Sequence, residues 1–475
     1  MSSVLRNIPS VTELLDSPPL KSLVNQVSRN VVVSGVRQFL DDMRTQVQSA
    51  AANVHVPTAT ELAQKIAEWI ATEERPPLRP VINATGILLH TGLGRAPLAE
   101  EAIAAIGEMA RGYASVEIDL ASGERSQRGL AVERELMRLS GAEAAAVVNN
   151  NAGATLLTLA ALAAGREVIV SRGQLIEIGG SYRLPEVMSA SGAVLREVGT
   201  TNKTRIGDYA AAIGERTAAL LRVHTSNYAV VGFTEEAPLA ELVALGRRHN
   251  LPVIDDIGSG ALIDLSKYGV QGEPVAAESI KAGADLVLFS GDKLLGGPQC
   301  GIIAGRRGLV QQIMKHPLMR AFRVDKLTLA ALAATLLLYP DPALAERSIP
   351  LLTLLATPLE NLRHRAERLA PQIQATGIAA VEVIAGQAFV GGGSLPNQAL
   401  ATICLALTPA SGTVDALATA LRNSTPAVVG RIQDGRLLLD LRSVQPRDDA
   451  GLVAAVEAMR SVKAAPPPAP ELTPV

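Results

Sequence analysis

The sequence predicts an α/β protein with a mostly parallel sheet, joined to a helical N-terminal domain and a small C-terminal α+β domain. Short apolar runs typical of strands alternate with helix-like runs between residues 140 and 305. Parallel strands need helical crossovers, and a sheet covered on both faces has strands that are apolar throughout. The strand-like runs include AAAVVNN, EVIVS, AALLRVH, LPVIDD and DLVLFS.

The length and the flanking patterns predict the domain boundaries. A chain of 475 residues exceeds the roughly 250 to 300 residues at which one core usually stops growing. Residues 1–72 contain helical patterns and end near the charged, proline-rich stretch ATEERPPLRP, and residues 73–335 form the predicted large domain. Residues 336–462 mix strands with helices, and the proline-rich tail at 463–475 is expected to be disordered.

Composition excludes several classes of protein. The formal net charge is −2, so the field of the whole protein does not favour nucleic acid or anionic membranes. Two cysteines, Cys300 and Cys404, are too few for a disulfide framework and fit a reducing compartment. The N-terminus lacks the apolar stretch of a signal peptide, and no apolar run reaches the roughly 20 residues that span a bilayer. We therefore expect a cytoplasmic protein.

A lysine in a glycine-rich turn is the first candidate for catalysis. Lys293 lies in SGDKLLGGP, directly after the strand-like run DLVLFS. Open α/β sheets bind ligands beyond the carboxyl ends of their strands, and a lysine held there at a lowered pKa suits a Schiff base. An isolated lysine in such a turn is far more often solvated. The residues after the neighbouring strands favour the catalytic interpretation.

Two aspartates follow the preceding strand-like run, LPVI. The ring nitrogen of pyridoxal 5'-phosphate needs a carboxylate partner if the ring is to act as an electron sink, and adjacent strand ends can supply the lysine and the acid together. We favour Asp255 over Asp256 for the ring nitrogen because Asp255 follows the run directly. Without the lysine, solvated or helix-capping aspartates would explain the pair equally well.

The start of a helix supplies the third group. Asn151, Ala152 and Gly153 precede the helical run ATLLTLAALAA, after AAAVVNN. Backbone N–H groups at a helix N-terminus bind phosphate, and Ser290, just before the lysine turn, can add a donor. Alone, this loop is better explained by ordinary capping from Asn151. The ordered set of phosphate loop, acid and lysine predicts a pyridoxal-phosphate enzyme.

This order and spacing are those of fold-type-I pyridoxal-phosphate-dependent transferases, and SGDKLLGGPQCG resembles the bacterial selenocysteine synthases, the L-seryl-tRNA(Sec) selenium transferases. The resemblance covers nearly the whole chain, including a helical N-terminal segment like the one that binds tRNA in that family. Other segments that carry it are VINATGILLHTGLGRAPL, YASVEIDLASGERSQRG, VVNNNAGATLL, RGQLIEIGGSYRLPEVM, EVGTTNKT, VHTSNYAVVGFT, VIDDIGSG, LMRAFRVDKLTLAAL, GGGSLP and LDLRSV.

The resemblance implies a reaction and an assembly. Lys293 would hold pyridoxal 5'-phosphate and then act as the base for the Cα proton of L-seryl-tRNA(Sec). The serine hydroxyl would leave as water to give an aminoacrylyl-tRNA, and selenium from selenophosphate would add at Cβ to give L-selenocysteinyl-tRNA(Sec). The resemblance also implies a homo-oligomer, specifically a homodecamer.

The selenium donor requires a second anion site besides that of the cofactor phosphate. The resemblance implies that Arg320 and Arg323 serve this site as catalytic residues, together with Arg95 of GLGRAPL. Planar guanidinium groups bind phosphate-like oxygens through two parallel hydrogen bonds. Surface ion pairs are the alternative explanation for these arginines. His224, at the end of a strand-like run, is expected either to contact the cofactor or to be structural.

The roles of four other polar residues stay open on the sequence. Gln174, Glu177 and Arg183 lie in a loop-rich stretch after EVIVS and could flank the cofactor ring. Arg442 in DLRSV is similar to the arginine that binds the substrate carboxylate in many fold-type-I enzymes. An aminoacyl ester has no free carboxylate, so that role is doubtful in this family. The sequence predicts no metal site.

Binding of tRNA is implied by the resemblance and not by overall charge. Acidic and basic residues nearly balance in the helical N-terminal domain, whereas nucleic-acid binders normally show a positive stripe. Lys21, Arg29, Arg37 and Arg44 recur at seven- or eight-residue intervals, which could align them on one helical face. Solvated charge explains these residues equally well.

Two other classes of function remain open. A fold-type-I lyase or desulfurase acting on a free small amino acid would need an arginine for the substrate carboxylate and no N-terminal tRNA-binding domain. A non-catalytic relative that uses the fold as a binding scaffold is disfavoured, because lysine, acid and phosphate loop are all present.

Overall fold

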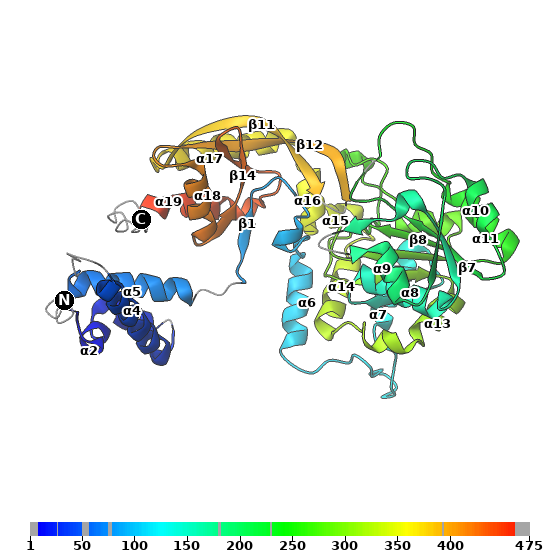
Figure 1. Ribbon diagram of the computed structural model, residues 1–475, viewed down its shortest axis with the longest axis horizontal. Coiled ribbons are helices and arrows are strands. Elements are labelled where there is room, and N and C mark those ends of the chain that lie inside the picture. Colours follow the sequence, from blue (N-terminus) through cyan, green and yellow to red (C-terminus); the bar gives the residue numbers. More distant parts are fainter. Residues whose placement is uncertain are drawn as a thin grey trace. The chain divides into compact units, whose positions relative to one another are not determined.

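The computed structural model divides into two compact units, Met1–Pro80 and Val81–Val475 (Figure 1). The predicted disordered tail at 463–475 lies outside the described residues. The structure describes residues 8–25, 27–49, 57–74, 78–178, 182–228, 230–391 and 394–460.

The N-terminal unit is helical, as the sequence predicts. Thr58 begins the last helix through a reciprocal cap, in which its amide donates to Glu61 Oε2 at 2.9 Å and the Glu61 amide donates back to Thr58 Oγ1 at 3.3 Å. Apolar residues at helical spacing, among them Leu14, Val36 and Ile66, form a core of the unit's own. The helices are α2 (Val11–Leu15), α3 (Pro18–Val24), α4 (Arg29–Ser49) and α5 (Ala59–Glu73).

The second unit contains a seven-stranded sheet in the order β2-β10-β9-β8-β7-β3-β6. Only β10 runs antiparallel to its neighbours, so the predicted mostly parallel sheet is confirmed. The strands are β2 (Ala144–Val148), β3 (Glu167–Ser171), β6 (Val194–Val198), β7 (Thr217–Val223), β8 (Val253–Gly258), β9 (Leu286–Ser290) and β10 (Gly301–Gly305).

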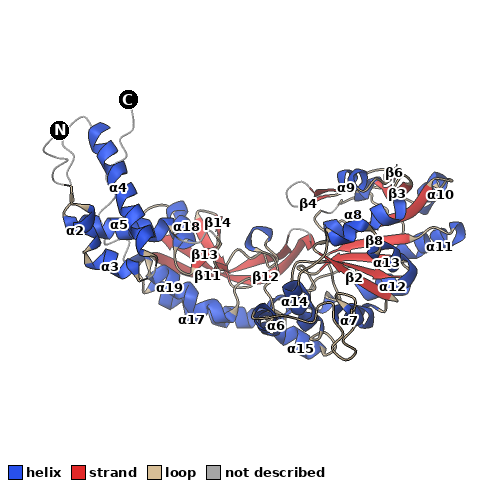
Figure 2. Ribbon diagram, turned by 90° about the horizontal axis from the view of Figure 1, so that it is seen from below, coloured by secondary structure: helices blue, strands red, loops and turns tan. Residues whose placement is uncertain are grey.

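Helices cover both faces of this sheet (Figure 2). Alternate residues of β2, β9 and β10 enter two separate apolar cores, one shared with α7, α12 and α14 and the other with α8, α9 and α13. These helices are α7 (Leu130–Ser140), α8 (Asn151–Ala163), α9 (Leu184–Ala190), α12 (Ala276–Ala282), α13 (Arg307–Met314) and α14 (Lys326–Leu336). The others in this part are α6 (Glu100–Ala110), α10 (Ile206–Ala212), α11 (Leu239–His249), α15 (Pro342–Ser348) and α16 (Pro350–Ala356).

The C-terminal part is a four-stranded antiparallel sheet with helices, in the order β11-β12-β15-β14. A separate two-stranded parallel sheet pairs β1 (Val81–Asn83) with β13 (Ala427–Val429). This sheet joins the N-terminal end of the unit to its C-terminal part. The remaining elements are α17 (Leu359–Gln374), β11 (Ala379–Gly391), β12 (Ser394–Pro409), α18 (Val414–Asn423), β14 (Arg431–Gln433), β15 (Arg436–Asp440) and α19 (Asp449–Glu457). The α+β character that the sequence predicts for this part is present, and the part lies in the same compact unit as the central sheet.

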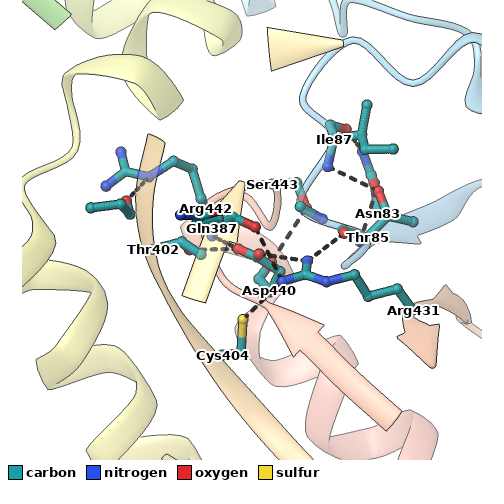
Figure 3. A network of polar contacts seen from close by, with 12 residues as sticks. Asn83, Thr85, Ile87, Gln387, Thr402, Cys404, Arg431, Asp440, Arg442 and Ser443 are labelled. Carbon is teal, nitrogen blue, oxygen red and sulfur yellow. Dashed lines mark hydrogen bonds and ion pairs between the residues drawn. The ribbon is translucent and has the colours of Figure 1, made fainter. Parts of the chain in front are cut away.

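A buried ion pair fastens the β1 segment to the small sheet (Figure 3). Asp440 has no exposed surface and accepts hydrogen bonds from Thr402 Oγ1, from Arg431 Nη1 at 2.7 Å and from the Arg442 amide at 3.1 Å. Arg431 Nη1 also donates to the Thr85 carbonyl at 2.6 Å. Since a buried carboxylate is costly unless it is fully paired, this network fixes the backbone at Thr85 strongly.

The next residue continues the same attachment. The Gly86 amide donates to Ser443 Oγ at 2.9 Å, and Gly86 has a φ of 82°. A side chain there would collide with the ion pair. Glycine is therefore required at position 86 both by the positive φ and by the lack of space for a Cβ. The Leu89 amide then donates to the Val390 carbonyl at 2.7 Å, and η1 (Thr91–Leu93) leads toward the central sheet.

Both cysteines are buried and unpaired with each other. Burial is the main cause that raises the pKa of the Cys404 thiol to about 12, and it also raises the pKa of Cys300. The thiols therefore stay protonated. Within the described ranges, no helix has the length and apolar character needed to cross a membrane.

Candidate active site

A cavity of about 380 Å³ lies beyond the carboxyl ends of the central strands. The ends of β7, β8 and β9 and the start of α8 form its wall, which is where open α/β sheets bind ligands. The predicted site residues in this wall are Arg95, Asn151, Ala152, His224, Ser290 and Lys293. The predicted site residues outside it are Gly153, Asp255, Arg320 and Arg323.

Lys293 lies on a tight turn after β9 and is only 6% exposed. The turn is tight because Gly291 has no side chain: a Cβ there would collide with Cys300 Sγ. The Leu294 amide donates to the Ser259 carbonyl at 2.9 Å, which ties the turn to the loop after β8. The amine is thus held at the cavity by backbone contacts on both sides.

The charges around Lys293 suit an amine that must lose its proton. Burial lowers the pKa of the Lys293 amine, the positive charge of Arg95 lowers it further, and Asp292 and Asp256 oppose both effects. Arg95 is held by an ion pair from its Nη1 to Asp292 Oδ2 at 2.9 Å. Asp292, the residue before Lys293, therefore holds the guanidinium group of Arg95 in the cavity.

The strand β8 includes both aspartates and turns them to opposite faces of the sheet. Asp256 lines the cavity and accepts hydrogen bonds from Asn151 Nδ2 and Thr155 Oγ1, each at 2.9 Å. Asp255 lies outside the cavity and pairs with Arg222 Nη1 at 2.9 Å. The geometry thus replaces Asp255 by Asp256 as our candidate for the ring nitrogen, because only Asp256 reaches the cavity.

Separate substitutions of the two aspartates should give different defects. Asp256→Asn should lower kcat by about ten- to a hundredfold, because a hydrogen bond to a charged group contributes about 1.5 to 3 kcal/mol. Asp255→Asn leaves Arg222 without its carboxylate partner and should lower thermal stability while sparing kcat. Steady-state kinetics and thermal denaturation of the two variants would check this, and the reverse pattern would restore Asp255 as the ring partner.

The two asparagines at the start of α8, Asn150 and Asn151, have different roles. Asn150, and not Asn151, caps the helix, since Asn150 Oδ1 accepts from the Gly153 amide at 2.8 Å. The Gly153 amide is therefore already occupied, whereas Asn151 and Ala152 face the cavity. Asn151 Oδ1 and Ser226 Oγ are buried in the cavity wall, and no other described residue hydrogen-bonds to them. Such orphaned groups fit a polar ligand with donors and acceptors.

Comparison with known proteins identifies the family. The family model described as L-seryl-tRNA selenium transferase matches residues 81–445, and a model of the selenocysteine synthase N terminus matches residues 5–44. The chain belongs to the L-seryl-tRNA selenium transferase family. This is a family of pyridoxal-phosphate-dependent transferases, so the predicted family and enzyme class are confirmed.

Relatives in this family match the chain over nearly its whole length. An L-seryl-tRNA(Sec) selenium transferase of Desulfomicrobium baculatum is 47% identical over 462 residues, covering 97% of this chain and 99% of that protein. The Moorella thermoacetica enzyme of the same name is 49% identical over 456 residues, 96% of each chain. Among solved structures, a D-glucosaminate-6-phosphate ammonia-lyase shares the fold, with a TM-score of 0.57 and 21% identity over 82% of this chain and 97% of that one.

Two arginines that the family resemblance suggested lie beside the cavity and not in its wall. Arg320 and Arg323 are both exposed. Arg323 Nη1 lies 3.4 Å from Glu117 Oε1, and the Phe322 carbonyl accepts from the Asn149 amide at 2.9 Å. Their segment therefore runs directly beside the start of α8. Their predicted anion-binding role in this family stays a prediction.

The other polar candidates separate into cavity and surface residues. His224 and Ser290 line the cavity. Gln174 is buried and its Oε1 accepts from the Val223 amide at 3.0 Å, so it supports β7. Glu177 and Arg183 form an exposed ion pair at 2.9 Å on the two short strands β4 (Glu177–Ile178) and β5 (Tyr182–Arg183). Of these residues, only His224 and Ser290 are placed to meet a ligand.

Arg442 does not offer a carboxylate site. Its Nε donates to the Ala401 carbonyl at 2.9 Å, and its Nη1 donates to the Leu354 and Thr357 carbonyls at 3.1 and 2.9 Å. The side chain is buried, and its Nε and Nη1 donors are directed at the backbone. Arg442 therefore joins the small sheet to the α16 region and is structural.

Sequence reasoning missed several residues in or beside the cavity, among them the following. Asp292 holds Arg95, Thr155 holds Asp256, and Tyr182 lines the wall. The position of Asp292 next to the lysine, and of Thr155 one helical turn after Asn151, were signals in the sequence. Tyr182 carried none, because the segment that brings it to the cavity has no regular pattern.

Proposed function

We propose that this chain converts L-seryl-tRNA(Sec) to L-selenocysteinyl-tRNA(Sec) and takes its selenium from selenophosphate. The observation that carries the proposal is a buried lysine with a lowered pKa, which faces a buried aspartate across a cavity at the strand ends. Relatives that carry the name of this activity match both the catalytic unit and the N-terminal helices.

The residues of the cavity fit pyridoxal 5'-phosphate. Lys293 would hold it covalently, Asp256 would pair with its ring nitrogen, and the orphaned oxygens of Asn151 and Ser226 offer hydrogen bonds. Ala152 and Ser290 would contribute to the phosphate site, and His224 lines the same cavity. When bound, the cofactor supplies an electron sink for the charge that develops at the substrate Cα.

The chain's own groups account for the remaining requirements. The lowered pKa of Lys293 suits it to take the Cα proton of the seryl group, after which the β-hydroxyl leaves as water. Arg95, fixed by Asp292, would attract the anionic selenium donor to the same cavity, with Arg320 and Arg323 contributing from the adjacent segment. Selenium would then form its bond at Cβ.

The N-terminal unit carries a basic stripe that supports tRNA binding. Arg29, Arg37 and Arg44 are exposed on α4 and lie within an arc of about 80° at 100° per residue. Arg44 is paired with Asp41 at 2.7 Å, whereas no ion pair to a described residue involves Arg29 or Arg37. Two unpaired guanidinium groups on one helical face are suited to phosphate contacts.

Charge reversal on this stripe should weaken tRNA binding without affecting the cavity. Arg29→Glu with Arg37→Glu should raise the Kd for tRNA by at least about tenfold and lower the slope of log K against log salt by about two, one for each lost phosphate contact. Filter binding over a salt series would measure both. Lys65→Glu, which changes an exposed residue of α5, is the matched control. An equal rise in Kd in that variant would show that tRNA does not bind specifically to the stripe on α4.

A homo-oligomer, and by resemblance a homodecamer, is part of the proposal. Large apolar side chains such as Tyr113, Val231 and Phe233 are exposed in this single chain, and association between copies would remove such side chains from water. A charged-tRNA substrate would place the reaction in the cytoplasm.

The proposed function is tested by comparing two substrates. The visible spectrum of the purified protein should change on addition of seryl-tRNA(Sec) and not of free serine. Selenophosphate should then give selenocysteine on the tRNA, identified by mass spectrometry after deacylation. A change with free serine alone would favour a lyase on a small amino acid. The backbone contacts of Arg442 argue against that alternative, since they engage the Nε and Nη1 donors of the arginine that would bind the free carboxylate.

A further inference from the structure

His224 lines the cavity and lies beside Glu273, a buried acid to which the proposed function gives no role. His224 follows β7 directly, and its amide donates to the Asp256 carbonyl at 2.9 Å. Its ring Nε2 lies 3.4 Å from Glu273 Oε1, and this is the ring's one polar contact within the described ranges. The distance is long for a hydrogen bond, but such contacts at active sites tighten when a substrate binds.

Glu273 is an acid in an unusual environment. Its side chain is 2% exposed, and Oε2 has no hydrogen-bond partner among the described residues. The segment that carries it is fixed by a bridge between Ala261 and Val275 and by the Ala276 amide, which donates to the Ala261 carbonyl at 3.0 Å. A buried carboxylate that has one weak contact is costly, so a nearby positive charge would stabilise it.

The imidazole of His224 is the group placed to carry that charge. A carboxylate accepts and cannot donate, so it favours a proton on Nε2 and leaves Nδ1 as the second position of the ring. The negative charge of Glu273 also acts on Lys293, which lines the same cavity as His224. The titratable and charged groups around His224 are Glu273, which contacts its ring, and those that line the same cavity, namely Arg95, Tyr182, Asp256, Asp292 and Lys293.

We propose that Glu273 is a positioning residue that holds His224 as the proton donor to the departing hydroxyl of the seryl substrate, an inference that rests on the proposed function. Lys293 takes the Cα proton, and the electron pair of that C–H bond becomes the Cα–Cβ double bond. The Cβ–O bond breaks, the oxygen takes a proton from His224, and water leaves. Solvent water returns the proton to the imidazole before the next turnover.

The pairing is tested without turnover. Diethyl pyrocarbonate modifies neutral imidazole, so the pH midpoint of His224 modification in the full-length enzyme, read by peptide mass spectrometry, reports its ionisation. Glu273→Gln should lower this midpoint by about one pH unit or more, since loss of an adjacent carboxylate disfavours the charged ring. Glu278→Gln, an exposed acid in the first turn of α12, should leave it unchanged. Equal midpoints in wild type and Glu273→Gln would overturn the proposal.

The donor role is tested by the pH profile of water loss from seryl-tRNA(Sec). In Glu273→Gln the alkaline limb of the pH profile of kcat should move to lower pH by the same amount as the modification midpoint, while KM stays unchanged. Glu273→Asp should restore part of this shift. A kcat lowered equally at every pH would indicate a structural role only and overturn the proposal. A wild-type enzyme that does not act on seryl-tRNA would overturn the proposed function itself, whereas an active wild type with an unshifted limb would overturn only the role of Glu273.

Discussion

Lys293→Ala should abolish turnover while leaving the protein folded. The amine is the one group in the cavity wall placed to hold the cofactor covalently and to move the Cα proton, and loss of a general base alone typically costs about a hundred- to ten-thousandfold in rate. The visible absorbance of the bound cofactor should be lost as well. Burial lowers the pKa of this lysine, so the ammonium form is disfavoured in the folded state, and its removal should leave the protein folded with a midpoint lowered only by the loss of the bound cofactor and of side-chain packing.

The measurement combines absorbance, a single-turnover assay and thermal denaturation. Lys281→Ala is the matched control, because Lys281 is exposed near the end of α12. Normal absorbance and turnover in Lys293→Ala would remove the central assignment. Loss of folding in that variant would instead show that the turn needs the lysine for stability.

Gly86→Ala should destabilise the second unit strongly. The backbone at Gly86 has a φ of 82°, and an added Cβ would collide with Arg431 Nη1 and Asp440 Oδ2. The collision separates a buried ion pair, and breaking such a pair costs about 3 to 5 kcal/mol. The midpoint of thermal denaturation should therefore fall by at least about 5 °C.

Two further glycines separate the causes of this effect. Gly412→Ala changes a glycine with a φ of 78° and open space around it, so it reports the backbone strain alone, roughly 1 to 2 kcal/mol. Gly107→Ala, in α6 and also in open space, should be neutral or stabilising by up to about 1 kcal/mol. Equal midpoints for the Gly86 and Gly412 variants would show that the ion pair adjusts and does not resist the side chain.

The fold was predictable from the sequence because its strongest signals are local. Apolar runs such as EVIVS and DLVLFS alternate with helical patterns, and this alternation defines a parallel sheet. The reversed direction of β10 was not predictable, since a buried strand has the same composition in either direction. The pairing of β1 with β13 was also missed, because it joins residues that are far apart in sequence and carry no local sign of their partner.

The segments that form the candidate site were predictable from the sequence, whereas the individual residues that face the cavity were less so. The lysine turn and the start of α8 both line the cavity. The choice between Asp255 and Asp256 depended on where β8 ends, and the strand continues to Gly258, so both aspartates are inside it. Residues that act through another residue, such as Glu273, have no motif at all. Their importance arises only when folding brings them beside a partner.

The attachment of Gly86 to Ser443 has a consequence for the order in which the protein matures. These residues are 357 positions apart, and β1 needs β13 as its partner. During synthesis the N-terminal end of the catalytic unit emerges long before its partners, so β1 must wait until almost the whole polypeptide has been translated. Arg95 follows closely on this segment, so the backbone that leads to the cavity is anchored on its N-terminal side only when the small sheet has formed. A truncated translation product that has already formed the central sheet would hold Arg95 through Asp292 but would still lack the contacts that fix the backbone at Thr85 and Gly86.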